Sequence, residues 1–281
     1  MPENFFPAAD ADRAITQSLA EDVGAGDITS IATVPESTPG RAVFQAKDTG
    51  VLCGLPVLQR VYAHLDPRVQ VELLVDEGSP VTPGTRVALV HGSARSLLTG
   101  ERVALNFLQH LSGIATRTAI FVKLVEGTGA RIVDTRKTVP GLRALAKYAV
   151  RVGGGHNHRF GLYDGVLIKD NHLQAAGGIH PAIQRARELA PHTLRVEVET
   201  ETLVQVQEAL AAGADVVLLD NMDLETCRQA VALCRGRALT EASGGINEQT
   251  LRAIAETGVD LISVGALTHS VAALDISLDW E

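Results

Sequence analysis

Cysteine, aromatic residues and long apolar runs are all scarce in this sequence of 281 residues. The three cysteines, Cys53, Cys227 and Cys234, show neither the even number of a disulfide framework nor the paired spacing of a zinc site, so we expect buried packing residues. No apolar run approaches the ~18 residues that a membrane-spanning helix needs. The first 12 residues also lack the apolar segment of a signal peptide. We therefore expect a cytoplasmic protein that does not act on a membrane.

Basic side chains are outnumbered, with 25 Lys or Arg against 33 Asp or Glu and a formal net charge of −8. This balance disfavours nucleic acid or an anionic membrane as the main partner. The segment 131–172 is an exception, because it holds eight Lys or Arg against three Asp, a net charge of +5. An acidic chain has therefore concentrated its cations in one segment. Three of them, Arg143, Lys147 and Arg151, share one helical stretch, where we expect a solvated cationic face.

Short apolar runs alternate with amphipathic stretches in the second half of the chain. The runs cover 131–134, 165–168, 194–198, 216–219, 239–242 and 261–264. Helical periodicity is clearest in 201–212, 224–235 and 248–256. Strands that alternate with helices pair in parallel, because each crossover returns the chain to the same end of the sheet. We expect an α/β fold, and the absence of a glycine-rich dinucleotide-binding turn favours a closed (β/α) barrel over an open doubly wound sheet.

The first hundred residues predict a separate α+β domain. Extended runs at 41–47, 50–55, 69–76 and 85–91 are separated by turn signals at 66–67, 78–80 and 83–84. A long helical pattern over 96–126 joins this domain to the barrel, with Gly113 as the expected irregularity. We place the N-terminal domain at 1–115 and the barrel at 116–270, with the tail 271–281 packing on the N-terminal domain.

Every expected barrel strand is followed by polar or glycine-rich residues, and barrel enzymes place their active sites at these C-terminal strand ends. Because side chains two residues apart share a face of a strand, Glu197 and Glu199 both point into the barrel. Asp220, and Glu241 with Ser243, follow the same alternation on later strands. The alternative is a set of structural ion pairs in the barrel lumen. Reactive residues at every strand end favour an active site.

Two glycine-rich segments precede helical stretches near the C-terminus. Residues 243–247 and 265–267 occupy the late positions where barrels commonly hold a phosphate on backbone N–H groups. Tight turns also use glycine for steric reasons alone, so it is the position of these glycines that supports a phosphate site. A third segment, 153–159, combines three glycines with His156, His158 and Arg159. Two histidines at this spacing, without a cysteine or a third ligand nearby, do not predict a zinc site.

Five segments of the barrel together resemble the quinolinate phosphoribosyltransferase family, the nicotinate-nucleotide pyrophosphorylases. They are 134–138, 140–143, 147–150, 153–159 and 167–172. The resemblance extends to 21–29, 100–106, 219–221 and 265–270, and no functional position departs from it. It implies an N-terminal α+β domain followed by an incomplete, seven-stranded TIM-like (β/α) barrel.

The resemblance implies the conversion of quinolinate and phosphoribosyl pyrophosphate into nicotinate mononucleotide, pyrophosphate and carbon dioxide, with Mg²⁺, as the entry step of de novo NAD synthesis. It assigns quinolinate binding to Arg136, His158, Arg159, Lys169 and the Arg102 of a neighbouring subunit. It assigns phosphoribosyl pyrophosphate binding to Lys137, Glu199, Asp220, Ser243, Gly244, Gly245, Gly265 and His269. The expected catalytic residues are Lys137, Lys169, Glu199 and Asp220, of which Glu199 and Asp220 hold Mg²⁺ partly through the substrate. A shared Arg102 implies a homodimer or a higher oligomer.

Two other functions stay open. A related phosphoribosyltransferase that acts on nicotinate, or a paralogue associated with metal transport, would share this architecture. Nicotinate lacks the second carboxylate, however, and the cations of the expected quinolinate site would be too many for it. A non-catalytic protein that binds anionic metabolites would need the cations and the glycine loop, but not Glu199 and Asp220.

Overall fold

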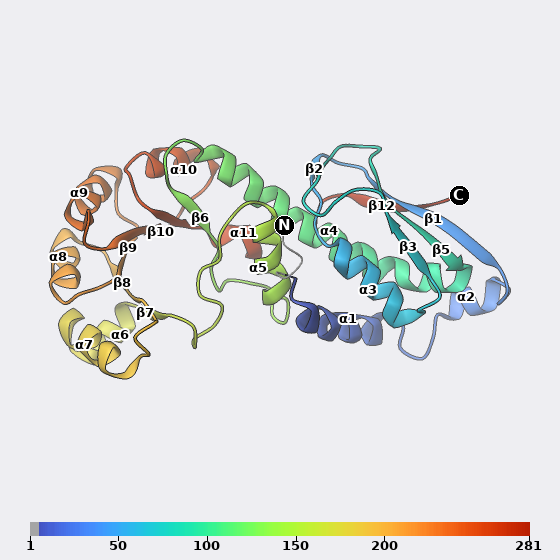
Figure 1. Ribbon diagram of the computed structural model, residues 1–281, viewed down its shortest axis with the longest axis horizontal. Coiled ribbons are helices and arrows are strands. Elements are labelled where there is room, and N and C mark those ends of the chain that lie inside the picture. Colours follow the sequence, from blue (N-terminus) through green and yellow to red (C-terminus); the bar gives the residue numbers. More distant parts are fainter. Residues whose placement is uncertain (1–5) are drawn as a thin grey trace. The chain divides into compact units, whose positions relative to one another are not determined.

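The computed structural model describes residues 6–281, which form two compact units (Figure 1). The first unit comprises residues up to 119 together with 138–154 and 267–281, and the second comprises 120–137 and 155–266. Residues 1–5, part of the stretch assessed above for a signal peptide, lie outside the described residues. Between residues 6 and 281, no helix combines the length and the apolar character that crossing a bilayer requires.

The first unit contains a four-stranded antiparallel sheet in the order β12-β1-β5-β3. Its strands are β1 (Pro39–Ala46), β3 (Gln70–Leu73), β5 (Arg86–Ser93) and β12 (Ile276–Trp280), and a separate pair is formed by β2 (Gly50–Val51) and β4 (Pro80–Val81). Its helices are α1 (Ala8–Asp22), α2 (Ile28–Thr33), α3 (Leu55–Leu65), α4 (Ala94–Leu124), which continues into the second unit, and α5 (Arg143–Val152). The predicted strand over 50–55 was wrong beyond Val51, because Leu55 begins a helix whose first turn accepts Pro56.

The C-terminal tail completes the sheet of the first unit. Strand β12 pairs antiparallel with β1, and Lys47 Nζ lies 2.8 Å from Asp279 Oδ2 beside this pairing. The units differ from the predicted ranges at 116–119, 138–154 and 267–270, which belong to the first unit rather than the barrel. The range 138–154 contains helix α5, six of whose residues are buried.

Helix α4 runs without a break through Gly113, so the expected irregularity there was wrong. The glycine serves a different purpose. A Cβ at this position would lie 2.2 Å from the carbonyl oxygen of Ala272, so only glycine lets the backbone of the tail approach the helix this closely.

The second unit is an incomplete (β/α) barrel, as predicted. Its parallel sheet has the order β6-β11-β10-β9-β8-β7. The strands are β6 (Arg131–Val133), β7 (Val166–Ile168), β8 (Val196–Thr200), β9 (Val216–Asp220), β10 (Leu239–Ser243) and β11 (Leu261–Ser263). The sheet has six strands rather than the seven that the resemblance implied, and beside it His156 forms an isolated parallel bridge with Val133 of β6. Segment 156–165 thus contacts β6 at His156, and within it Arg159 Nη1 donates to Gly165 O, just before β7, at 3.0 Å.

Helices lie on the outer side of this curved sheet (Figure 1). They are α6 (Asp170–Ala176), α7 (Ile179–Leu189), α8 (Leu203–Ala211), α9 (Leu224–Cys234) and α10 (Glu248–Ala255). The short α11 (Ala266–His269) follows β11 and belongs mostly to the first unit. The side chains of Thr202, Asp223 and Asn247 accept hydrogen bonds from backbone N–H groups and begin α8, α9 and α10. Because these helices begin soon after the strands end, the loops after β8, β9 and β10 are short. Several of the predicted site residues lie beside those loops.

Two predictions about single side chains have clear outcomes. All three cysteines are buried free thiols, as expected. Lys147 is only 2% exposed, so the expectation of a solvated cationic face on α5 was wrong at this residue. A lysine is almost never buried this deeply without a partner.

Candidate active site at the C-terminal strand ends

The strand order of the barrel brings the predicted site residues of the second unit together. Ser243 is in register with Asp220, and Glu199 is in register with Leu218 on the same β9 strand. Following the sheet, the strand ends carry Arg136 and Lys137 after β6, Gly265 after β11, Ser243 to Gly245 on β10, Asp220 on β9, Glu199 on β8 and Lys169 after β7. Cations therefore follow the two outer strands, while carboxylates and glycines lie between them.

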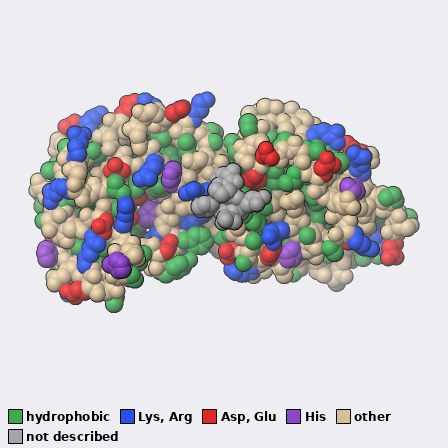
Figure 2. Space-filling view, viewed as in Figure 1, with side chains coloured by type: hydrophobic (Ala, Val, Ile, Leu, Met, Phe, Trp, Pro, Cys, Tyr) green, Lys and Arg blue, Asp and Glu red, His purple; other side chains and the backbone are tan. Residues whose placement is uncertain are grey.

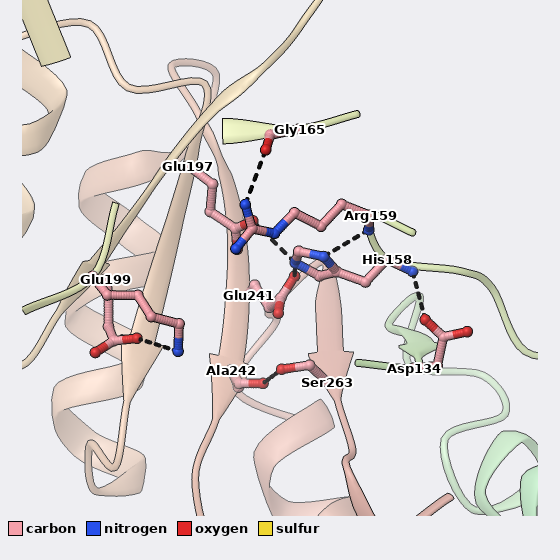
Figure 3. Close-up of polar contacts among 10 residues, drawn as sticks. Asp134, His158, Arg159, Gly165, Glu197, Glu199, Glu241, Ala242 and Ser263 are labelled. Atoms are coloured by element: carbon pink, nitrogen blue, oxygen red, sulfur yellow. Dashed lines mark hydrogen bonds and ion pairs between the residues drawn. The ribbon is translucent and has the colours of Figure 1, made fainter. Parts of the chain in front are cut away.

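Lys169 and Glu199 form an ion pair from neighbouring strands (Figure 3), with 3.3 Å between Lys169 Nζ and Glu199 Oε2. The lysine side chain is 50% exposed and the glutamate side chain 13% exposed. A half-exposed pair of this kind adds little to stability. Its consequence is chemical, because a change in either residue alters the charge that surrounds the other.

Asn221 joins Asp220 to the glycine loop. Its Nδ2 donates to Asp220 Oδ2 at 3.0 Å, and its backbone N–H donates to Ser243 O at 3.0 Å. Among residues 6–281, Asn221 is the one non-glycine residue with positive φ, 51°, a conformation that asparagine tolerates better than most residues. The sequence motif 219–221 included this residue without giving it a role. A left-handed asparagine directly after a strand-end aspartate is the signal that could have identified it.

Substitution of Gly244 should damage the glycine loop specifically. Its φ is +96°, and a Cβ would lie 2.1 Å from Asn221 Oδ1. We expect Gly244→Ala to raise the KM for phosphoribosyl pyrophosphate, the substrate that the family resemblance implies for this loop, at least about tenfold, because the loop and Asp220 would be displaced together. The control is Gly213→Ala, which has φ +86° and nothing within 4 Å of the added Cβ. Initial-rate kinetics of both variants make the comparison, and an equal effect of the two would contradict a role for the loop.

The charges of Arg136, which follows β6, and Arg159 of segment 156–165 influence each other. Burial lowers the pKa of Arg159, and the nearby positive charge of Arg136 lowers it further. Two cations held near each other at a partly buried position attract an anion between them. This arrangement supports the prediction that Arg136 and Arg159 contact a substrate carboxylate.

Asp134, a residue without exposed surface directly after β6, anchors the side chain of Asn157 and the backbone of His158. His158 N donates to Asp134 Oδ1 at 2.9 Å, and Asn157 Nδ2 donates to Asp134 Oδ2 at 2.6 Å. The His158 ring turns toward the barrel lumen, where its Nε2 lies 3.0 Å from Glu197 Oε2 and 3.6 Å from Glu241 Oε2 (Figure 3). The structure thus brings His158 to two carboxylates from distant parts of the sequence.

These three side chains form the one group within residues 6–281 that has three His, Cys, Asp or Glu ligand atoms within 4.8 Å of one another. A metal-binding imidazole donates its second N–H to an acceptor. Here the second nitrogen, Nδ1, instead accepts the backbone N–H of Arg159 at 2.7 Å. Nδ1 therefore carries no hydrogen, and Nε2 carries the hydrogen that it shares with Glu197. This tautomer does not suit a metal ligand.

Glu241 carries a proton near neutral pH. Its side chain is almost completely buried, and burial together with the charge of Glu197 raises its pKa from 4.5 to about 8. Glu197 is 6% exposed, and its Oε1 is buried without a hydrogen-bond partner. The sequence placed both glutamates in the lumen, but it could not show that they share one histidine.

The raised pKa of Glu241 predicts a pH-dependent stability. The folded state keeps a proton that the unfolded state releases above pH 4.5, so the free energy of unfolding falls as pH rises from 4.5 to about 8 and then levels off. Glu241→Gln cannot ionise and should lose this decline, which we expect to be on the order of a few kcal/mol. Denaturant unfolding of both proteins at about pH 5 and about pH 9 measures it. The same decline in both would contradict the assignment.

The remaining predicted residues belong to the first unit. Arg102 is exposed on α4, and His269, also exposed, ends α11 with Ser270 Oγ 2.5 Å from its Nδ1. Their proposed contacts with substrate stay predictions. On the face shown in Figure 2, acidic and basic side chains are interspersed over the barrel unit.

Comparison with known proteins adds independent information. Residues 27–112 match the family "Quinolinate phosphoribosyl transferase, N-terminal domain" and residues 114–279 match its "C-terminal domain". The chain is 49% identical over 259 residues to "Probable nicotinate-nucleotide pyrophosphorylase (carboxylating)" of Bacillus subtilis, covering 92% of this chain and 89% of that protein. It is 41% identical to "Quinolinate phosphoribosyltransferase (decarboxylating) 2a, mitochondrial" of Nicotiana tabacum, covering 97% and 82%. The solved nicotinate-nucleotide pyrophosphorylase of Francisella tularensis has a TM-score of 0.94 and 42% identity, covering 98% and 97%.

Proposed function

Because the chain belongs to the quinolinate phosphoribosyltransferase family, we propose that the strand ends of its barrel bind quinolinate among the cations and phosphoribosyl pyrophosphate over the carboxylates and the glycine loop. The reaction transfers the phosphoribosyl group to quinolinate and releases pyrophosphate and carbon dioxide. Its product is nicotinate mononucleotide, which enters NAD synthesis. The observation that carries the assignment of sites is the strand order, in which Arg136, Lys137 and Lys169 follow the two outer strands while Glu199, Asp220 and the glycine loop lie on the strands between them.

Quinolinate has two adjacent carboxylates, so its site must place several cations at fixed positions. The positive charge of Arg136 lowers the pKa of Arg159. Lys169 follows β7, the strand at the other edge of the sheet from β6. Arginine binds a carboxylate through two parallel N–H groups, which also fixes the orientation of the ring. Arg102 of a second subunit completes the site in this proposal.

Phosphoribosyl pyrophosphate fits the central strands. The positive φ values of Gly244 and Gly245 turn the backbone after Ser243, and α10 begins at Glu248. Backbone N–H groups before a helix bind a phosphate, here the 5′-phosphate. Glu199 and Asp220 then face the ribose hydroxyls, and Lys137 faces the pyrophosphate.

Mg²⁺ belongs to the proposal as well. Glu199 and Asp220 offer oxygen ligands from neighbouring strands, and Mg²⁺ typically takes one or two carboxylates together with phosphate oxygens and water. The donor set therefore fits the ion. When bound, it would neutralise charge on the pyrophosphate.

The side chains account for the main steps by position and charge. As pyrophosphate leaves, the ribose gains positive charge, which the carboxylates of Glu199 and Asp220 stabilise electrostatically. The pyridine nitrogen of quinolinate, held by the arginines, attacks the anomeric carbon. The alkylated ring then withdraws the electron pair of the adjacent carboxylate bond, carbon dioxide leaves, and the ring carbon takes up a proton. Orientation alone contributes on the order of 7 kcal/mol in such reactions.

A homodimer, or a higher oligomer, with shared active sites and a cytoplasmic location complete the proposal. The exposed position of Arg102 supports the first point, since its guanidinium is available to another subunit. The buried free thiols support the second, because a reducing compartment keeps such cysteines unpaired.

Quinolinate labelled at its 2-carboxylate tests the function directly. Incubation with phosphoribosyl pyrophosphate and Mg²⁺ should release labelled carbon dioxide and form an equal amount of nicotinate mononucleotide. Nicotinate should be a far poorer substrate in the same assay. Efficient turnover of nicotinate would favour the related phosphoribosyltransferase, and binding without release of carbon dioxide would favour a non-catalytic protein.

A further inference from the structure

A layer of buried acidic side chains lies beneath the proposed active site. Glu197 and Glu241 each precede a proposed site residue by two positions on the same strand and share its face. Both line a cavity of about 450 Å³, whose wall also contains the first residues of several strands, including Arg131 and Val216. This cavity thus extends toward the N-terminal ends of the strands, away from the end where barrel substrates bind. His158 and Arg159 line the same cavity, so it joins the two glutamates to two residues of the proposed quinolinate site.

His158 connects these acids to the quinolinate site. Its Nε2–H donates to Glu197 Oε2 at 3.0 Å, and Glu241 Oε2 lies 3.6 Å from the same Nε2. Its Nδ1 accepts the backbone N–H of Arg159 at 2.7 Å. The His158 ring therefore links β8 and β10, through Glu197 and Glu241, to the backbone N–H of Arg159.

Segment 156–165 needs such support because it has no regular structure beyond the single bridge at His156. Without helix or strand hydrogen bonds, the backbone there depends on side-chain partners. Asp134 holds the segment from β6, the His158 ring holds it from β8 and β10, and Asp164 accepts the backbone N–H groups of Phe160 and Gly161. Of these partners, the His158 ring is the one that accepts the backbone N–H of Arg159, so its loss would weaken the hold on that residue.

We propose that Glu197 and Glu241 are positioning residues that act through His158 to hold Arg159 for a carboxylate of quinolinate. This inference rests on the proposed function, because it requires Arg159 to bind that substrate. It also changes the role expected of His158, whose two ring nitrogens here serve the protein scaffold. Glu197 additionally attracts the Arg159 guanidinium through its negative charge.

The test compares Glu197→Ala with Glu197→Gln. Alanine removes the acceptor of the Nε2–H and should raise the KM for quinolinate roughly tenfold to hundredfold, because a small displacement of a positioning group costs that much. The KM for phosphoribosyl pyrophosphate should stay within about twofold. Glutamine keeps an amide oxygen as acceptor and should restore most of the quinolinate affinity. Glu241→Gln, which preserves a neutral side chain, should likewise resemble the wild-type protein.

Thr240→Val is the matched control for loss of stability. Thr240 is 1% exposed on the same strand as Glu241, and its Oγ1 donates to Asp260 Oδ2 at 2.8 Å, away from His158. This variant should unfold at a lower temperature without a selective change in the KM for quinolinate. An unchanged KM in Glu197→Ala, or an equal rise for both substrates, would overturn the inference.

The tautomer of His158 provides a measurement that does not depend on turnover. Long-range ¹H–¹⁵N spectra of the wild-type protein, with His158 assigned by its absence in His158→Gln, should show a protonated Nε2 and an unprotonated Nδ1. A protonated Nδ1 would overturn the inference even in an active enzyme. A wild-type protein that binds no quinolinate would instead refute the proposed function, and an active wild-type protein with an unaffected Glu197→Ala would refute the inference alone.

Discussion

Two inactive variants, Arg102→Ala and Lys137→Ala, should recover about a quarter of wild-type activity when they are unfolded together and refolded. Arg102 lies exposed on α4, whereas Lys137 follows the first strand of the barrel. If each site combines Arg102 of one subunit with the barrel of the other, a mixed dimer has one complete site and one that carries both defects. Random pairing makes about half the dimers mixed, and half of their sites are complete.

The control for this experiment is each variant refolded alone, which should stay inactive. An Arg102→Ala protein with nearly full activity would make Arg102 an ordinary surface residue. An inactive Arg102→Ala protein that no partner rescues would place Arg102 in the site of its own subunit. Either result would remove the argument for a shared active site.

Lys169→Ala should weaken quinolinate binding far more than phosphoribosyl pyrophosphate binding. Removing the cation leaves a substrate carboxylate without its charged partner, which costs about 2–5 kcal/mol in a desolvated site. It also leaves Glu199, now 3.3 Å from Lys169, without that ion pair and adds repulsion toward quinolinate. Calorimetric titration with each substrate measures the two affinities.

Lys123→Ala is the matched control, because it removes the same side chain from an exposed position in the last turn of α4. It should leave both affinities unchanged. Equal losses for both substrates in Lys169→Ala would contradict the assignment of Lys169 to the dicarboxylate site. A loss confined to phosphoribosyl pyrophosphate would reassign the residue.

The barrel could be predicted from the sequence because its strands are short apolar runs separated by periodic helices. All six runs between 131 and 264 form strands of one parallel sheet. The seventh strand that the resemblance implied is absent from this sheet, and the isolated bridge at His156 has no apolar run that could have predicted it. In the first unit the predicted strand over 50–55 was wrong beyond Val51, because a short apolar segment does not distinguish a strand from the start of a helix.

The proposed site could be predicted only in part. Strand alternation correctly turned Glu197 and Glu241 into the lumen, where both are buried. It could not show which histidine they share, because His158 belongs to a segment without periodic structure. Nor could it show that Lys147 is buried, since this depends on packing within the first unit rather than on the helix itself.

The edge strand β12, at the end of the chain, pairs with β1, which lies near its beginning. The Lys47–Asp279 contact joins residues 232 positions apart, so during synthesis β1 leaves the ribosome long before its partner strand exists. Sheets built from such distant segments form slowly, and an unpaired edge is prone to join other chains meanwhile. The N-terminal unit therefore finishes folding only after the whole barrel has been translated, and trimming the last residues would damage the opposite end of the sequence.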